Sequence, residues 1–322
     1  MPTLAGALRR RLLMPDLSEV TFDKRGFHER DPRARLLLEH SGRQFLAGFG
    51  HAMDGRDMDD TRRLLETVER PFRGFAYEGA SMAFTLTDVM TPWRRTRVRA
   101  FLDGPGSPHV YMAYVGIGWA MARLPRPLRR GIAVPDPLLR WLAIDGYGFH
   151  QAYFATQRYV REKRAPGVRA PWADPSGYAE RVADQGIGRA LWFVCGADVE
   201  RLATVIGEFA PARRSDLWSG AGLAAAYAGG IEADEAETLL KLATGFRGEL
   251  AQGCAFAAEA RLRADLVTPD TRTAAQVFCR TSVEAAAAVT QDALVDLPSD
   301  GPVPAYELWR QRIRAAFEDV GG

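Results

Sequence analysis

His150 is the residue whose type and position point most directly to chemistry. It lies in the segment DGYGFHQAYF, with Asp145, Tyr147 and Tyr153 close to it in sequence. An imidazole titrates near neutral pH and can serve as a general acid or base, with a carboxylate to orient it. Asp145 is five residues away, about 140° around a helix, so the spacing alone does not pair them. The alternative is a structural histidine whose hydrogen bonds are satisfied.

Two carboxylates, Glu78 and Asp145, form a second candidate site. Both occupy the same place in a repeated motif, on stretches that are otherwise apolar. Burying an unpaired carboxylate is costly, so each is either hydrogen-bonded or functional. Such a pair could protonate an alkene or bind a metal ion. Arg189 or Arg280, at equivalent places in other copies, could instead neutralise them as structural ion pairs.

The acidic segment DGRDMDD supplies a third candidate through Asp57, Asp59 and Asp60. Its D-x-D-D core resembles the acid motif of class II terpene cyclases, in which an aspartic acid protonates an alkene. Clustered carboxylates could also hold Mg²⁺ and a diphosphate. A structural explanation competes with both, because acids gather at helix N-termini and TRRLLETVE follows directly.

The elements that carry these residues repeat along the chain. A motif of Gly followed four residues later by Ala recurs roughly every 33 residues, the length of helix-pair repeats. Small residues four apart share one helical face and allow a neighbouring helix to approach closely. Six copies keep both residues: GFGHA at Gly48, GASMA at Gly79, GIGWA at Gly116, GIGRA at Gly186, GAGLA at Gly220 and GCAFA at Gly253. Two variants, GYGFH at Gly146 and TSVEA at Thr281, bring the set to eight.

Equivalent positions of stacked repeats line one surface, so the copies can be read in columns. The residues before each motif glycine are Ala47, Glu78, Val115, Asp145, Gln185, Ser219, Gln252 and Arg280. A second column lies four residues after the first and consists of His51, Met82, Trp119, Phe149, Arg189, Leu223, Phe256 and Glu284. This mixture could line a groove for an extended apolar molecule with a few polar handles, or could consist of packing contacts. The expected substrate-binding residues are Tyr77, Trp119, Tyr147, Phe149, Tyr153 and Trp218.

The pattern predicts an all-α fold, built as a pseudo-twofold duplicated array of helical hairpins, solenoid-like or αα-barrel-like. The first four copies align with the last four at similar offsets, which predicts two homologous halves. We expect an N-terminal arm over 1–38, helical-repeat halves over 39–165 and 177–295, and a C-terminal helix within 296–322. The halves are joined by RAPGVRAPWADPSG. Sustained two-residue alternation is missing from the sequence, so a sheet has little support.

Composition narrows the class of protein. The net charge of +2 gives no electrostatic reason to expect a nucleic-acid partner. The longest apolar run, 110–122, is short of the ~20 residues that span a bilayer. Three scattered cysteines, Cys195, Cys254 and Cys279, predict a reducing, cytoplasmic compartment rather than a disulfide framework. Phosphate-loop and dinucleotide motifs are missing, so neither a redox cofactor nor a metal centre is expected.

Several long motifs resemble a bacterial family of unknown function, the UnbL type encoded beside enediyne polyketide synthases. They are RGFAYEGASMAF, HVYMAYVGIGWAMARL, DGYGFHQAYF, GRALWF and SDLWSGAGLAAAYAGG, in the same order over roughly 45–260. The resemblance implies specialised-metabolite biosynthesis on a polyene or polyketide-derived intermediate, with a polyketide synthase as a partner. It supplies no catalytic residues.

Three functions follow from these observations. The first is an enzyme or substrate-shaping protein for a hydrophobic polyene or polyketide intermediate, with acid–base-assisted cyclisation as the reaction. It would be a cyclase, isomerase or lyase without a cofactor. The second is a class II-like isoprenoid cyclase with an aspartate or glutamate acid, for which Mg²⁺ would be a cofactor. The third is a helical-repeat scaffold that docks a synthase.

Overall fold

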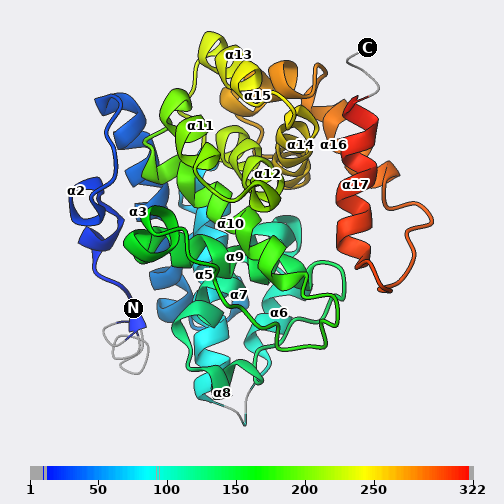
Figure 1. Cartoon of the computed structure of the whole chain (residues 1–322). Coiled ribbons are helices and arrows are strands. Elements are labelled where there is room, and N and C mark those ends of the chain that lie inside the picture. Colours follow the sequence, from blue (N-terminus) through cyan, green and yellow to red (C-terminus); the bar gives the residue numbers. More distant parts are fainter. Residues whose placement is uncertain (1–9, 11–12, 92, 94, 319–322) are drawn as a thin grey trace.

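The computed structural model describes residue 10 and the ranges 13–91, 93 and 95–318. This part of the chain contains helices and no strand, which confirms the all-α prediction (Figure 1). The longer helices are α3 (Pro32–Asp54), α4 (Met58–Glu66), α5 (Arg73–Met90), α6 (Arg97–Asp103), α7 (Val110–Arg123), α9 (Arg140–Phe154), α10 (Ala179–Val194), α11 (Val199–Gly207), α12 (Pro211–Ala228), α13 (Ala233–Leu242), α14 (Arg247–Arg263), α15 (Pro269–Phe278), α16 (Val283–Asp292) and α17 (Ala305–Glu318). Short helical turns precede α3 (η1, Leu17–Val20; α2, Phe22–Arg25), precede α5 (η2, Arg70–Phe72) and α7 (η4, Ser107–His109), and follow α7 (α8, Arg126–Arg129) and α9 (η5, Gln157–Arg161).

Helix boundaries follow local sequence signals. Asp31 accepts a hydrogen bond from the Ala34 backbone N–H and precedes Pro32, so α3 begins with a cap and a preset first residue. Asp198 caps α11 in the same way. Each capping oxygen satisfies a backbone donor that has no partner inside the helix.

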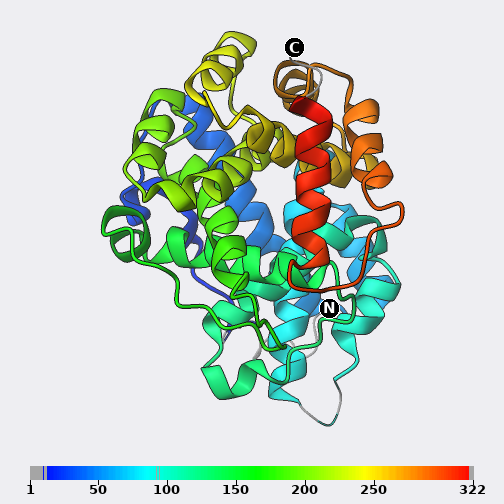
Figure 2. The same ribbon diagram turned by 45° about the vertical axis from the view of Figure 1, so that its right-hand side comes forward.

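The motif helices form the centre of the molecule. The helices α3, α5, α7, α9, α10, α12, α14 and α16 pack in that order, each against the next, and α4, α6, α11, α13 and α15 connect them from outside. Helix α3 also contacts α12, and α7 contacts α14. The array is therefore curled around a central axis rather than extended, as Figures 1 and 2 show.

Motif glycines allow the closest contacts between these helices. A Cβ atom on Gly116 would lie 2.1 Å from the Glu78 carbonyl oxygen, and one on Gly220 would lie 1.9 Å from the Gln185 carbonyl oxygen. Real Cβ atoms do not come so close to backbone, so a side chain at either position would push the helices apart. Ser81 takes the second small position of its motif, and its Oγ donates to the Ala113 carbonyl at 2.7 Å.

The first motif copy has a different register from the one expected. Gly79 faces the Phe45 carbonyl, whereas Gly48 faces the Ala76 carbonyl, which is the contact that the second glycine of other copies makes. The first copy therefore begins at Leu46, and its column residues are Phe45 and Phe49, not Ala47 and His51. The run GFG offers two small residues with the same spacing, which explains the error. The last copy begins at Thr281 in the turn before α16, not on a helix.

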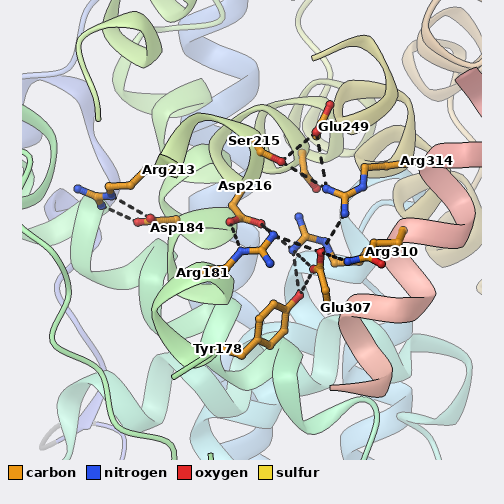
Figure 3. A network of polar contacts seen from close by, with 12 residues as sticks. Tyr178, Arg181, Asp184, Arg213, Ser215, Asp216, Glu249, Glu307, Arg310 and Arg314 are labelled. Atoms are coloured by element: carbon orange, nitrogen blue, oxygen red, sulfur yellow. Dashed lines mark hydrogen bonds and ion pairs between the residues drawn. The ribbon is translucent and has the colours of Figure 1, made fainter. Parts of the chain in front are cut away.

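Helix α17 is fastened to the array through a buried polar network. Figure 3 shows Arg310 of α17 between Asp216 of α12, Glu307 and Tyr178. The Arg310 guanidinium is fully buried, at 2.8 Å from Asp216 and 3.3 Å from Glu307. Two opposite charges offset the cost of burying it, so α17 docks in one position.

The predicted domain boundaries coincide with helix ends only in part. The expected end of the N-terminal arm at 38 falls inside α3, because that helix begins at Pro32. The expected linker falls between α9 and α10, which nevertheless pack directly together. The final segment contains α17, as expected. The duplication of the two halves stays a prediction.

Candidate functional site

Two internal cavities lie along the central axis, and the predicted columns line much of them. One cavity, of about 40 Å³, has Glu78 in its wall, and the other, of about 30 Å³, has Asp145. Each volume holds a few water-sized molecules. Column residues of the Glu78 cavity are Phe45, Glu78, Trp119, Phe149, Arg189 and Leu223; those of the Asp145 cavity are Val115, Asp145, Arg189, Leu223 and Phe256.

Glu78 is a carboxylic acid buried in an aromatic environment. It lies on α5 and is 3% exposed. Burial raises its pKa to about 8, although Arg189 and the Trp119 indole lower the value in part. A carboxyl group with this pKa keeps its proton at neutral pH. Its cavity surface is mainly apolar, with the rings of Phe75, Phe149 and others around it.

Arg189 of α10 and Asp145 of α9 form a buried ion pair beside this acid. Arg189 Nη1 donates to Asp145 Oδ1, while Asp145 Oδ2 has no hydrogen-bond partner among the described residues. Burial lowers the pKa of Arg189, but the carboxylates of Asp145 and Glu78 outweigh that effect and raise it. One cation therefore serves two carboxyl groups. Asp145 takes the direct contact, and Glu78 is left as the neutral member.

Aromatic rings pack together in the wall of the Glu78 cavity. Trp119 of α7 lies 4.5 Å from Phe45 and 5.2 Å from Phe149 between ring centroids. Tyr153 stacks on Phe149 at 5.7 Å. The Trp119 indole acts on the Glu78 carboxyl group and lowers its pKa in part. The faces of aromatic rings stabilise positive charge that develops on a neighbouring ligand.

His150 borders a different space, on the outer side of Trp119. A cleft of about 430 Å³ is lined by Met82, Trp119, Arg123, His150 and Phe154, together with residues of the N-terminal segment. The His150 ring meets Trp119 edge-on at 5.5 Å and Phe154 at 4.6 Å. Burial and the Arg123 charge lower its pKa to about 3, and Nδ1 has no described partner. The imidazole is therefore neutral at physiological pH and available as a hydrogen-bonding group.

A match over residues 4–317 joins the chain to the family described as "Protein of unknown function (DUF1702)". The chain belongs to the DUF1702 family. No curated protein and no solved structure matches it. The function of this DUF1702 protein is therefore argued from the geometry of its own site.

The acidic segment of this DUF1702 chain is a helix cap rather than an enclosed acid site. Asp57 is exposed and accepts the Asp60 backbone N–H at the start of α4. Asp60 pairs with Arg56 at 3.2 Å, which holds the pKa of that carboxyl well below its usual range. Asp59 is exposed on the same turn. The helix dipole and the pairing with Arg56 account for the acidic cluster, as the structural explanation anticipated.

Three predicted binding residues also lie away from the two cavities. Tyr77 donates to Glu66 at 3.1 Å and stacks on His109, under a separate surface cleft. The Tyr147 hydroxyl accepts a hydrogen bond from Gln151. Trp218 stacks on Phe246 at 6.4 Å. Each of the three lies off the helix face that carries Glu78, Asp145 and Phe149 to the cavities, so their role in binding stays a prediction.

Sequence reasoning left out several residues of the DUF1702 site. Arg189 belongs to a predicted column, but the sequence indicates only that it could neutralise a carboxylate. Tyr227 of α12 lines both cavities, and the Arg261 guanidinium lies 3.9 Å from its ring centroid. Glu259 of α14 accepts from Tyr111 at 3.3 Å and lines the Asp145 cavity. Tyr227 and Glu259 lie seven and six positions beyond their motif glycines, so extending the predicted columns by one further helical turn identifies them.

Two further observations concern the described residues as a whole. They contain no group of three or more His, Cys, Asp or Glu side chains placed to bind a metal ion. None of their helices combines the length and the apolar character that crossing a membrane requires. Cys195, Cys254 and Cys279 are buried and free.

Proposed function

We propose that this protein binds a hydrophobic polyene or polyketide-derived intermediate and rearranges it, with Glu78 as the general acid. The observation that carries the proposal is a protonated carboxyl group facing a cavity lined by aromatic rings. An acid of raised pKa in an apolar pocket is a recurrent arrangement in acid catalysis.

The pKa of Glu78 favours one kind of proton transfer. A carboxyl group with a pKa of about 8 can give its proton to the oxygen or the carbon of an enolate as the enolate develops in a conjugated chain. It is a poor acid for an unactivated alkene, which class II cyclisation requires. In the proposed reaction Glu78 gives a proton at one position of the chain, and the resulting carboxylate removes one from another position. The atoms balance without a cofactor, and the product is an isomer or a cyclised isomer.

Arg189 would stabilise the carboxylate that forms on Glu78. Its charge already acts on Glu78, and it is held in place by Asp145. A fixed cation costs no reorganisation at the moment of proton transfer. Asp145 is thus a positioning residue in this scheme.

The sequence resemblance to the UnbL type supports an enediyne-type polyketide as the source of the substrate. A polyketide synthase in the cytoplasm is then the supplier of substrate. The cyclase alternative through Asp57, Asp59 and Asp60 loses its structural support, because Asp57 caps α4 and the other two lie in the first turn of that surface helix. The scaffold alternative stays a prediction; the exposed large apolar side chains of the described residues lie on different elements.

Replacement of Glu78 tests the proposal. Glu78→Gln keeps the shape of a neutral carboxyl group and removes the transferable proton. We expect the variant to fold, to bind a fluorescent tetraene fatty acid as the natural chain does, and to abolish product formation in the producing strain. Glu66→Gln, which alters a carboxylate outside the cavities, is the matched control and should keep full production. Full production by Glu78→Gln would overturn the proposal.

A further inference from the structure

The outer cleft and the two cavities lie in a row and share their walls. Val20, Phe45 and Trp119 line both the outer cleft and the Glu78 cavity. Arg189, Leu223 and Tyr227 line both the Glu78 cavity and the Asp145 cavity. Each space is therefore separated from the next by a single layer of side chains.

The volumes and walls of this row fit one shape of ligand. The cleft of about 430 Å³ is followed by two much smaller spaces, of about 40 and 30 Å³, which leave room for a slender molecule only. Its lining is mainly aromatic and aliphatic in all three parts. A narrow apolar passage admits an unbranched chain and excludes a branched or ring-shaped molecule of equal volume.

We propose that these three spaces form one passage for an unbranched conjugated or acyl chain, and that Leu223 sets the chain length it accepts. The chain enters through the outer cleft, passes Trp119, reaches Glu78 and ends beyond Leu223 near Asp145. This inference rests on the proposed function for its substrate class, but it concerns binding rather than proton transfer.

Among the three residues between the inner cavities, Leu223 is the one whose side chain is held by packing alone. Arg189 is held by Asp145. Tyr227 is fixed by Arg261 on its ring face and by Phe75 at 5.3 Å. Leu223 of α12 is an aliphatic side chain of intermediate exposure, and a change of rotamer there would join the two cavities.

The far end of the passage is closed by polar groups and by α17. Glu259 accepts hydrogen bonds from Gln291 at 2.7 Å and from Tyr111 at 3.3 Å. Trp309 of α17 also lines this cavity, and its indole donates to the Thr290 carbonyl at 2.8 Å. These partners fix the end wall, so a chain that is too long cannot be accommodated by displacing them at low cost.

Chain-length profiles of Leu223 variants test the inference. A series of unbranched fatty acids of increasing length is used to displace a fluorescent tetraene fatty acid from the full chain. In the natural protein affinity should rise with length to a limit. Leu223→Trp should weaken the longest acids at least tenfold and leave the shortest unchanged, while Leu223→Ala should extend the limit. Leu262→Trp, the same substitution at an exposed leucine of α14, should leave the profile unchanged.

The outcomes separate this inference from the role of Glu78. Identical profiles for the natural chain and both Leu223 variants, all with natural helix content, would overturn the passage. So would equal affinity for linear and branched acids of the same carbon number. Glu78→Gln should keep the natural length profile; if it also keeps product formation, the acid role fails while the passage stands.

Discussion

Asp145 and Arg189, 44 residues apart in sequence, form a buried ion pair beside Glu78 on the central axis. The two side chains come from the adjacent helices α9 and α10. Their contact leaves the third ionisable group of the cluster, Glu78, without a counterion of its own. The proton on Glu78 is therefore a consequence of how the other two are paired.

Removing Arg189 should destabilise the fold strongly. Arg189→Met leaves the Asp145 carboxylate buried and unpaired, which costs about 3–5 kcal/mol of unfolding free energy. The double variant Arg189→Met/Asp145→Leu removes both charges and should recover most of that loss. Urea denaturation at neutral pH measures the free energy of unfolding of the single and the double variant. A single variant as stable as the natural chain would show that Asp145 is not held as a carboxylate.

Glu78 should make the protein less stable as the pH rises. Its pKa is about 8 in the folded chain and near 4.5 when unfolded, so folding favours the protonated form. The stabilising contribution of the protonated Glu78 to the free energy of unfolding is complete below pH 4.5. It is lost progressively up to about pH 8, by about 1.4 kcal/mol per pH unit. Glu78→Gln lacks this dependence.

The difference between the two proteins is the measurement that isolates Glu78, because every other group titrates in both. Denaturation curves from pH 5 to pH 8 should show Glu78→Gln gaining stability relative to the natural chain. Parallel curves over that range would mean that the Glu78 carboxyl group ionises normally, and the proposed general acid would lose its basis.

The close approach of α5 and α7 should fail when Gly116 gains a side chain. Its Cβ would lie 2.1 Å from the Glu78 carbonyl oxygen, which is backbone and cannot turn away. We expect Gly116→Ala to lower the unfolding free energy by about 3 kcal/mol. Gly207→Ala at the end of α11, where a Cβ meets nothing within 4 Å, should raise it by about 0.5 kcal/mol. Thermal unfolding compares them, and equal losses would contradict the packing argument.

The sequence was sufficient to predict the helical class and most of the inward-facing columns. Glu78, Asp145, Trp119 and Phe149 lie in the walls of the inner cavities because a helical repeat puts equivalent positions on one surface. The columns do not show which polar residues form ion pairs with one another, because the pairing depends on how the helical array curls. Asp145 has Arg189 as its partner only because α9 and α10 are adjacent.

Other parts of the site were beyond the reach of spacing arguments. Gln252 reads as a column residue, but its Oε1 accepts from Ser219 at 2.7 Å and from Arg310 at 3.2 Å. It therefore belongs to the contacts that fasten α17. Nothing in the motif spacing indicates where a helix after the last repeat will dock. The same docking brings Trp309 to the end of the passage, a residue that no column contains.

His150 offers the test that separates a binding role from a packing role. The other seven motif copies place a small residue where this chain has His150, Gly50 in the first copy and Ala in the rest. His150→Ala therefore restores a small residue, and the half-buried ring leaves space that opens into the cleft. The cost in stability should be below that of a core cavity. Binding of the tetraene fatty acid and product formation should nevertheless fall sharply, because the cleft loses a neutral hydrogen-bonding wall. His150→Phe keeps the ring packing on Trp119 without that hydrogen bond, and it should fold and lose binding in the same way. Full binding by either variant would remove His150 from the site, whereas unfolding of His150→Ala alone, with His150→Phe stable and active, would assign the imidazole to packing.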